Sequence, residues 1–414
     1  DKNTTIDSQG KLTHNGDYPN QSQYIFISDF GNLEGIAEEL VPMGFGALLQ
    51  PHNTTLATPS GSTVAMTFPS CSFVGATSGN GQKNNRESFD QNVYYGFDFN
   101  SKDSENYLNR LCANQIPTNE GSIVLTHMLN DKARIQSEIT VTRFANNFFY
   151  VLSSTASELK DLDWFRQNLF NSENVKIKNI TNEFGVLVVA GPNSRSLLSK
   201  LSKEDFGNQN FPWLKAKEIL VNNIPVKALR INYVGELGWE LHVSFKDMEK
   251  LYDSLIIAGK DLNISNFGTY ALNSLRLEKA YKGWGSELTG EISLAEAQMD
   301  RFYNLNKKNN FIGSNSLRKI LDKGIEIRIV YLEVEVDDAD PLGNEPVYYN
   351  NKIIGVVTSG GFGFRVKKSL AFAYITEKAA KISNEFQIKI LGSMRKARVL
   401  KTPAYDPNNK KLKS

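Results

Sequence analysis

The stretch INYVGELGWELHV, residues 231–243, constrains the fold of this 414-residue chain more than any other. Apolar and polar residues alternate on both sides of a centre that contains Gly235 and Gly238. Alternation around a glycine-bearing turn is typical of a β-hairpin. We therefore predict two short strands, with Glu236 at the turn and Glu240 inside the second strand. A strand carboxylate such as Glu240 must find hydrogen-bond donors if it is covered.

A helix is predicted in the segment that follows, FGTYALNSLRLEKAYKGWGSELTGE, residues 267–291. Its apolar positions follow helical spacing at Tyr270, Ala271, Leu275 and Ala280. Ser265 or Asn266 is expected to cap its start, and Gly283 is expected to end it. Together with the hairpin, this segment holds most of the side chains that suggest chemistry.

Composition limits the class of protein. Apolar residues make up 40% and charged residues 22%, which is ordinary for a globular protein, and the length predicts two or three domains. The 47 basic and 45 acidic residues leave a net charge of +2, so no general attraction to nucleic acid or to a membrane surface is expected. Two cysteines, Cys71 and Cys112, make no disulfide framework and favour a reducing intracellular compartment.

The rest of the chain mixes helices and strands, which predicts an α+β fold. Residues 1–24 are polar and are interpreted as a flexible lead-in. Residues 121–144 predict two strands joined by a turn at residues 130–134, and residues 157–169 predict an amphipathic helix with Leu159 on its apolar face. From residue 325 onward, short strands with turn signals predict a small β-barrel.

Three motifs carry a resemblance to a known family: YVGELGWEL (233–241), NSLRLEKAYKGWGSEL (273–288) and KTPAYDPNNKKLK (401–413). They resemble the folate-binding half of sarcosine and dimethylglycine dehydrogenases, which is itself similar to the aminomethyltransferase (T-protein) of glycine cleavage. The resemblance begins near Ser88 and does not cover residues 1–87.

The resemblance implies a clover-leaf of lobes around a folate channel, with a small C-terminal β-barrel. The predicted division is an unmatched, partly disordered segment 1–87, an aminomethyltransferase-like folate-binding domain 88–320, and a barrel domain 321–414.

Acidic side chains in the hairpin are candidates for binding a pterin, whose N–H and amino group form a pair of donors. One carboxylate can accept both with short, charge-assisted hydrogen bonds. The resemblance implies that aminomethyltransferases use the position of Glu236, whereas the dehydrogenases use those of Tyr233 and Glu240. The alternative is a solvated turn glutamate and a strand glutamate paired with Arg230 or Arg276.

Two further residues are candidates for the folate site. Arg276 could meet an acidic ligand tail or serve as a structural ion-pair partner. Tyr405, in the family's PAYDP tail, could close the folate pocket or pack in the core.

A catalytic carboxylate is implied at Glu138. The family places an aspartate in GGIEADLTV, which corresponds to residues 133–141 here. A carboxylate there can stabilise positive charge and accept a proton. This chain departs from the family in having Glu138 for the aspartate and Ala133 and Arg134 for the paired glycines. These departures favour binding over turnover, and an exposed strand glutamate is the alternative.

Other cofactor sites are not suggested by the sequence. The four histidines are scattered, no metal-binding spacing occurs, and we interpret His127 and His242 as structural. No strand–GxGxxG–helix unit occurs, so FAD is expected only on a missing domain or a partner subunit.

The sequence thus predicts an enzyme of one-carbon metabolism that transfers a methylene group from an N-methylated glycine, sarcosine or dimethylglycine, to tetrahydrofolate. The expected partners are that small substrate or its iminium and a flavin domain or subunit, without nucleic acid or membrane. The expected location is the mitochondrial matrix in a eukaryote and the cytoplasm otherwise. The first alternative is an inactive relative like the regulatory subunit of pyruvate dehydrogenase phosphatase. The second is a stand-alone aminomethyltransferase. The dehydrogenase-like PAYDPNNK tail argues against it, as does Leu272, at a position where the resemblance implies an arginine in aminomethyltransferases.

Overall fold

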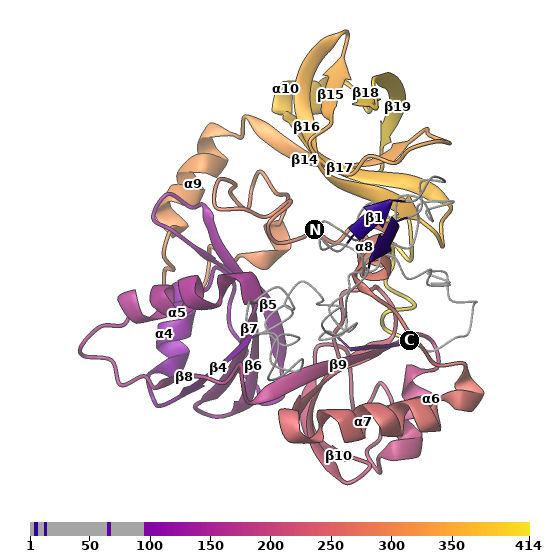
Figure 1. The fold of residues 1–414 in the computed structure, drawn as a ribbon. Helices are drawn as coiled ribbons and strands as arrows, with labels where there is room; N and C mark the ends of the chain where they lie inside the picture. Colours follow the sequence, from indigo (N-terminus) through magenta and orange to yellow (C-terminus); the bar gives the residue numbers. More distant parts are fainter. Residues whose placement is uncertain (1–3, 7–11, 15–63, 68–94) are drawn as a thin grey trace.

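The computed structural model describes residues 4–6, 12–14, 64–67 and 95–414, which form three lobes and a separate two-stranded sheet (Figure 1). Two lobes are built on sheets covered by helices, and the third is a closed six-stranded barrel. The predicted α+β fold with a C-terminal β-barrel is confirmed. The predicted domain limits stay a prediction. The predicted boundary after residue 320 lies inside helix α9 (Ser314–Lys323).

The first lobe is a five-stranded sheet in the order β5-β6-β7-β4-β8. Its strands are β4 (Tyr95–Asn100), β5 (Ile123–Leu129), β6 (Ile135–Ala145), β7 (Phe148–Ser153) and β8 (Ile177–Asn179). Helices α4 (Ser104–Leu111) and α5 (Glu158–Gln167) belong to the same lobe (Figure 1). The predicted turn between β5 and β6 is present, because Ala133 N donates to Asn130 O at 2.8 Å.

The predicted apolar face of helix α5 is correct at Phe165, which is buried, and at Leu162 and Leu169, which pack against the same core, but it is wrong at Leu159. Leu159 is 80% exposed, whereas Asp161 is fully buried. The Asp161 carboxylate accepts hydrogen bonds from Ser137 Oγ at 2.6 Å and Ser153 Oγ at 2.5 Å. Both strand hydroxyls donate to Oδ2 of this carboxylate, which offsets part of the cost of burying Asp161.

The second lobe is a sheet in the order β10-β11-β12-β9-β3-β13. Its strands are β3 (Val64–Thr67), β9 (Phe184–Ala190), β10 (Ala216–Val221), β11 (Ile224–Leu229), β12 (Gly238–Ser244) and β13 (Ser265–Asn266). Helices α6 (Ser194–Leu201) and α7 (Phe245–Ala258) share its core with alternate β12 residues, Trp239, Leu241 and Val243. By strand alternation Glu240 and His242 therefore project from the opposite face.

The predicted hairpin is partly wrong. Its second strand is β12, but the first strand, β11, ends at Leu229, and residues 230–237 form a loop. The Asn232 side chain accepts from the N–H groups of Val234 at 3.0 Å and Gly235 at 3.1 Å, and donates to Glu236 O at 2.8 Å. These side-chain hydrogen bonds take the place of the backbone hydrogen bonds that a β-strand would form here, so Tyr233 lies in the loop.

Helix α8 (Thr269–Glu278) is shorter than predicted at both ends, and its N-cap is Gly268. At its C-terminus, Tyr281 N donates to Arg276 O and Ala280 N donates to Leu277 O, each at 2.9 Å. Ala280 has a left-handed φ of +55°. These features define a Schellman motif, which ends the helix before Gly283.

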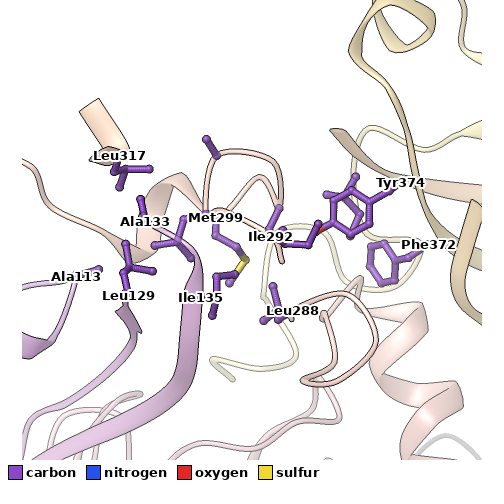
Figure 2. Packing of buried hydrophobic residues seen from close by; sticks show 14 of the residues in the cluster. Ala113, Leu129, Ala133, Ile135, Leu288, Ile292, Met299, Leu317, Phe372 and Tyr374 are labelled. Carbon is purple, nitrogen blue, oxygen red and sulfur yellow. The ribbon is translucent and has the colours of Figure 1, made fainter. Parts of the chain in front are cut away.

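The barrel closes in the order β14-β17-β16-β15-β18-β19. Its elements are β14 (Ile327–Val334), β15 (Pro346–Tyr349), β16 (Lys352–Gly363), β17 (Lys368–Thr376), helix α10 (Glu377–Ile382), β18 (Glu385–Ile390) and β19 (Ser393–Val399). A shared hydrophobic cluster fastens the barrel to the first lobe (Figure 2). In this cluster, Leu288, Ile292 and Met299 lie between Ile135 of β6 and Tyr374 of β17. These three residues belong to the connecting segment, which runs from the end of α8 to the start of α9.

The N-terminal predictions meet few described residues. Thr4–Ile6 and Leu12–His14 pair as a two-stranded antiparallel sheet, which differs from the expected flexible lead-in. Most of the predicted segment 1–87, with Cys71, lies outside the described residues.

Candidate functional site

The carboxylates around helix α8 differ in how many hydrogen-bond donors they meet. Glu287 is fully buried, and its two oxygens accept from five groups. These donors are Arg276 Nη1 at 2.9 Å, Gly283 N at 2.7 Å, Ser286 Oγ at 3.2 Å, Thr358 Oγ1 at 2.7 Å and Ser359 Oγ at 2.6 Å. A buried carboxylate satisfied this well has a structural role.

Arg276 belongs to the same network. Its guanidinium also donates to Asn273 Oδ1 at 2.8 Å, Tyr281 O at 3.2 Å and Ser359 Oγ at 2.8 Å. Of the two roles considered for Arg276, these contacts match the structural ion-pair partner. Its predicted contact with a ligand tail stays a prediction.

Glu236 is held by two residues from the barrel and the C-terminal tail. Its Oε1 accepts from Arg365 Nη1 and Tyr405 Oη, each at 2.6 Å. The Arg365 guanidinium also lies 4.0 Å from the centre of the Tyr405 ring. Glu236 is therefore not the solvated turn glutamate of the structural alternative, because Arg365 and Tyr405 hold its carboxylate.

The next residue of the tail supports the same corner. Asp406 accepts from Lys279 Nζ through its carbonyl at 2.5 Å and its Oδ2 at 3.2 Å. Gly235 has a φ of +73°, and a Cβ added there would lie 2.8 Å from Lys279 Cγ. The loop thus needs glycine at this position to let the lysine stem pass.

Tyr233 contacts the segment that follows helix α8. Its ring stacks on Tyr281 with centroids 5.7 Å apart, and its hydroxyl donates to Lys282 O. Burial is the main cause that raises the pKa of Tyr233; Arg276 opposes this shift, and Glu138 and Glu287 add to it. Glu138 of the first lobe is therefore an electrostatic neighbour of this second-lobe loop.

Glu240 is buried and poorly satisfied. Only 2% of the residue is exposed. Its register neighbours on the two flanking strands are Leu229 and Val188. Among the described residues it has one hydrogen-bond partner, His242 Nε2, at 3.3 Å from Oε2. A buried carboxylate in this state has capacity for further donors, which a ligand can supply.

Glu138 is paired with a buried histidine. It lies opposite His127 in the β5–β6 register, and its Oε1 is 3.3 Å from His127 Nε2. His127 is fully buried, and within the described part of the chain neither ring nitrogen has a partner with hydrogen-bond geometry. The Glu138 side chain is 21% exposed, so its carboxylate is open to an approaching group.

The turn before Glu138 carries the departures from the family pattern. Ala133 is fully buried and has a left-handed φ of +60°. Alanine therefore adopts the conformation for which glycine would be preferred. Arg134 Nη1 donates to Glu296 Oε2 at 2.5 Å, so its side chain is anchored to the connecting segment.

Strand registers relate the two candidate carboxylates. Glu138 shares one face of the first-lobe sheet with Thr142, which pairs with Tyr150. The Tyr150 hydroxyl lies 3.1 Å from His242 Nδ1, beside Glu240 on the second-lobe sheet. Four residues along β6 separate the rows of Glu138 and Tyr150 by roughly 14 Å. The contact between Tyr150 and His242 thus joins the two sheets beside Glu240, and Glu138 lies farther along the first sheet.

Sequence reasoning missed several residues of this region. Arg365 carries no local signal, because it lies in the β16–β17 connection and meets Glu236 only in the folded chain. His242 was interpreted as structural, although its spacing of two from Glu240 on one strand already placed both on one face. Tyr150 has no signal of its own.

Among the described residues, no group of histidine, cysteine and acidic side chains has the arrangement of a metal site. No helix in residues 95–414, or in the short described segments before them, has the length and apolar character to cross a bilayer.

Comparison with known proteins identifies the family. The GCVT N-terminal domain matches residues 80–307, and the glycine cleavage T-protein C-terminal barrel domain matches residues 328–406. The chain is 42% identical over 308 residues to mitochondrial dimethylglycine dehydrogenase from Homo sapiens, a match that covers 74% of this chain and 36% of that protein. It therefore spans about a third of that relative's length.

A second relative is matched over most of its length. An aminomethyltransferase from a Thermoanaerobacter species is 30% identical over 311 residues, covering 75% of this chain and 83% of the relative. The crystal structure of the glycine cleavage system aminomethyltransferase T from Bartonella henselae has the same fold, with a TM-score of 0.71 and 18% identity over 84% of this chain and 88% of that one. The chain therefore belongs to the aminomethyltransferase (glycine cleavage T-protein) family, and its match to dimethylglycine dehydrogenase confirms the relationship that the three motifs predicted.

Proposed function

We propose that this chain binds tetrahydrofolate and transfers a one-carbon unit to it from an N-methylated glycine, sarcosine or dimethylglycine. The observation that carries the proposal is the pair of poorly satisfied carboxylates, Glu240 and Glu138, on two sheets that meet through Tyr150 and His242. Glu287, in the same region, is saturated with donors and serves as the contrast.

Glu240 and Tyr233 would hold the pterin. The pterin offers two adjacent donors, and Glu240 is a buried acceptor with capacity for them. Glu236 is already engaged by Arg365 and Tyr405. This difference favours the dehydrogenase-type assignment of Tyr233 and Glu240 over the aminomethyltransferase-type assignment of Glu236. Arg276 and Tyr405 would support the walls of the site through Glu287 and Glu236.

Glu138 would act at the other end. When bound, tetrahydrofolate supplies the nitrogens that take up the one-carbon unit. Glu138 would stabilise positive charge there and accept a proton at its carboxylate. Its partial exposure suits a group that must receive a proton and release it.

Oxidation of the amine would take place elsewhere. Dimethylglycine dehydrogenase extends far beyond the part matched here. We propose that FAD acts on a further domain or a partner subunit, and that this chain receives the oxidised substrate. The names of the human, rat and mouse relatives include the mitochondrion, so we propose the mitochondrial matrix as the location.

Calorimetric titration with tetrahydrofolate tests the proposal. We expect the parent chain to bind, and we expect Glu240→Gln to weaken binding by about 1–3 kcal/mol, because a charge-assisted acceptor is lost. The control is Glu377→Gln, which alters a carboxylate paired with Arg328 in the barrel. Absence of binding by the parent would reject the proposal, and equal affinity of the two variants would remove Glu240 from the site.

A further inference from the structure

His242 joins the first lobe to the second at the proposed pterin end. It is fully buried on β12. Its Nε2 lies 3.3 Å from Glu240 Oε2, and its Nδ1 lies 3.1 Å from the Tyr150 hydroxyl on β7. A tyrosine of one sheet is therefore linked through a histidine to a carboxylate of the other.

The hydrogen-bonding capacity of Tyr150, His242 and Glu240 determines where the protons lie in these two contacts. An ionised carboxylate can only accept, and a neutral imidazole has one donor and one acceptor nitrogen. Both contacts are satisfied when His242 Nε2–H donates to Glu240 and His242 Nδ1 accepts from the Tyr150 hydroxyl. The tyrosine thereby selects the histidine tautomer that presents a proton to Glu240.

Aromatic packing fixes the first member of the chain. The Tyr150 ring meets Phe144, Phe184 and His242 edge to face, with centroids 5.9, 6.5 and 5.5 Å apart. Three such contacts hold a ring in one orientation. The direction of the Tyr150 hydroxyl is thus set before any ligand arrives.

We propose that Tyr150 and His242 are positioning residues that orient Glu240 toward the pterin donors. This inference rests on the proposed function. His242 occupies Oε2 of Glu240 and so directs the remaining acceptor capacity of the carboxylate toward the ligand. Glu138 has no comparable support, because its contact with His127 lacks hydrogen-bond geometry. Loss of Tyr150 or His242 should therefore affect folate affinity and not the chemistry at Glu138.

The test is calorimetric titration of tetrahydrofolate into single and double variants. We expect Tyr150→Phe to weaken binding ~5- to 10-fold, the loss of about one hydrogen bond. His242→Leu should weaken it ~10- to 30-fold, and His242→Gln should restore most of the loss because its amide can donate to Glu240. The control is Tyr107→Phe, which removes another buried first-lobe hydroxyl, bonded to Phe165 O, and should leave affinity unchanged.

A double-mutant cycle separates positioning from general structural damage. If Tyr150 acts through Glu240, adding Tyr150→Phe to Glu240→Gln should weaken binding by less than ~2-fold further. Full additivity, or equal affinity of Tyr150→Phe and Tyr107→Phe, would overturn the inference while the proposed function stands. Absence of binding by the parent would instead overturn the proposed function and this inference with it. If His242→Leu fails to fold, the tyrosine cycle alone decides.

Discussion

At the scale of single residues, the number of donors around a buried carboxylate separates support from ligand binding. Glu287 and Glu240 are both buried glutamates. Glu287 meets an arginine, a backbone N–H and three hydroxyls, whereas Glu240 meets one histidine among the described residues. The donors around Glu287 stabilise the fold. At Glu240, the single histidine contact offsets only part of the free-energy cost of burying a charge.

The same substitution at these two residues should therefore have different effects on stability. Glu287→Gln should lower the free energy of unfolding by about 3 kcal/mol, because it leaves Arg276 buried without its counter-charge. Glu240→Gln should stay within about 1 kcal/mol of the parent, because neutralisation relieves a poorly satisfied charge. Urea unfolding of both variants measures the difference. Equal destabilisation would contradict the distinction between the two carboxylates.

Only part of this residue-scale organisation could be predicted from the sequence. Alternation along β12 correctly put Glu240 inside a strand. The partner of Glu236 could not be predicted, because Arg365 is separated from it by 129 residues. Local patterns carry no information about which distant side chain arrives at a given carboxylate.

At the scale of elements, the end of a helix depends on contacts that cannot be predicted from the helix propensities of its residues. Helix α8 ends in a Schellman motif with alanine in the left-handed position that usually holds glycine. Apolar spacing continued through Ala280 to Gly283, so the sequence predicted a longer helix. The placement of Asp161 toward the sheet in α5 was missed for a related reason, since two strand hydroxyls offset its polarity.

Glycine at the end of α8 should stabilise the protein. Ala280→Gly should raise the free energy of unfolding by about 0.5–1 kcal/mol, because a left-handed φ costs alanine about that much more than glycine. The matched control is Ala271→Gly, inside the same helix, which should lower it by about 1 kcal/mol or more. Denaturant unfolding checks both. Destabilisation by both substitutions would show that the methyl group of Ala280 outweighs its backbone strain.

The C-terminus of α4 depends on one lysine. Lys307 Nζ donates to the carbonyls of Asn109 at 2.5 Å, Cys112 at 2.7 Å and Asn114 at 3.1 Å. Burial lowers the pKa of Lys307 to about 8, so most of the ammonium group is still charged at pH 7. A lysine at this end of a helix satisfies carbonyls that have no partner within the helix.

Lys307→Met should lower the free energy of unfolding by about 2–3 kcal/mol at pH 7, because buried carbonyls lose their donor. Lys308→Met, at the exposed neighbouring position, should change it by less than about 0.5 kcal/mol. Thermal and urea unfolding provide the measurement. A small effect at Lys307 would mean that other donors replace the ammonium group.

At the scale of the whole molecule, the segment after the barrel returns to the second lobe. Tyr405 and Asp406 contact Glu236 and Lys279. The Ser414 carbonyl accepts from Arg195 at 2.7 Å and from Arg230 at 2.9 Å. Residues 400–414 thus form a strap between two lobes that the sequence predicted separately. The lobes follow from their local patterns, but their mutual arrangement depends on these long-range contacts.

Arg365 is the centre of this connection. Arg365→Met should lower the free energy of unfolding by about 3 kcal/mol, because Glu236 and the buried Glu278 both lose a cationic neighbour. It should also speed tryptic cleavage within residues 400–414. Arg395→Met, which breaks an exposed pair with Asp338, should cost less than about 1 kcal/mol and leave cleavage unchanged. Identical digestion of both variants would show that the strap does not depend on Arg365.

The strap has a consequence for biosynthesis. Tyr405 follows Glu236 by 169 residues, so at ordinary translation speeds it leaves the ribosome roughly 10–30 s later. During that interval the loop that carries Tyr233 and Glu236 lacks Tyr405. For most of the interval it lacks Arg365 as well. A nascent chain can therefore complete its first sheet early, whereas the acidic loop beside the proposed pterin site gains its native partners only after the barrel has been made.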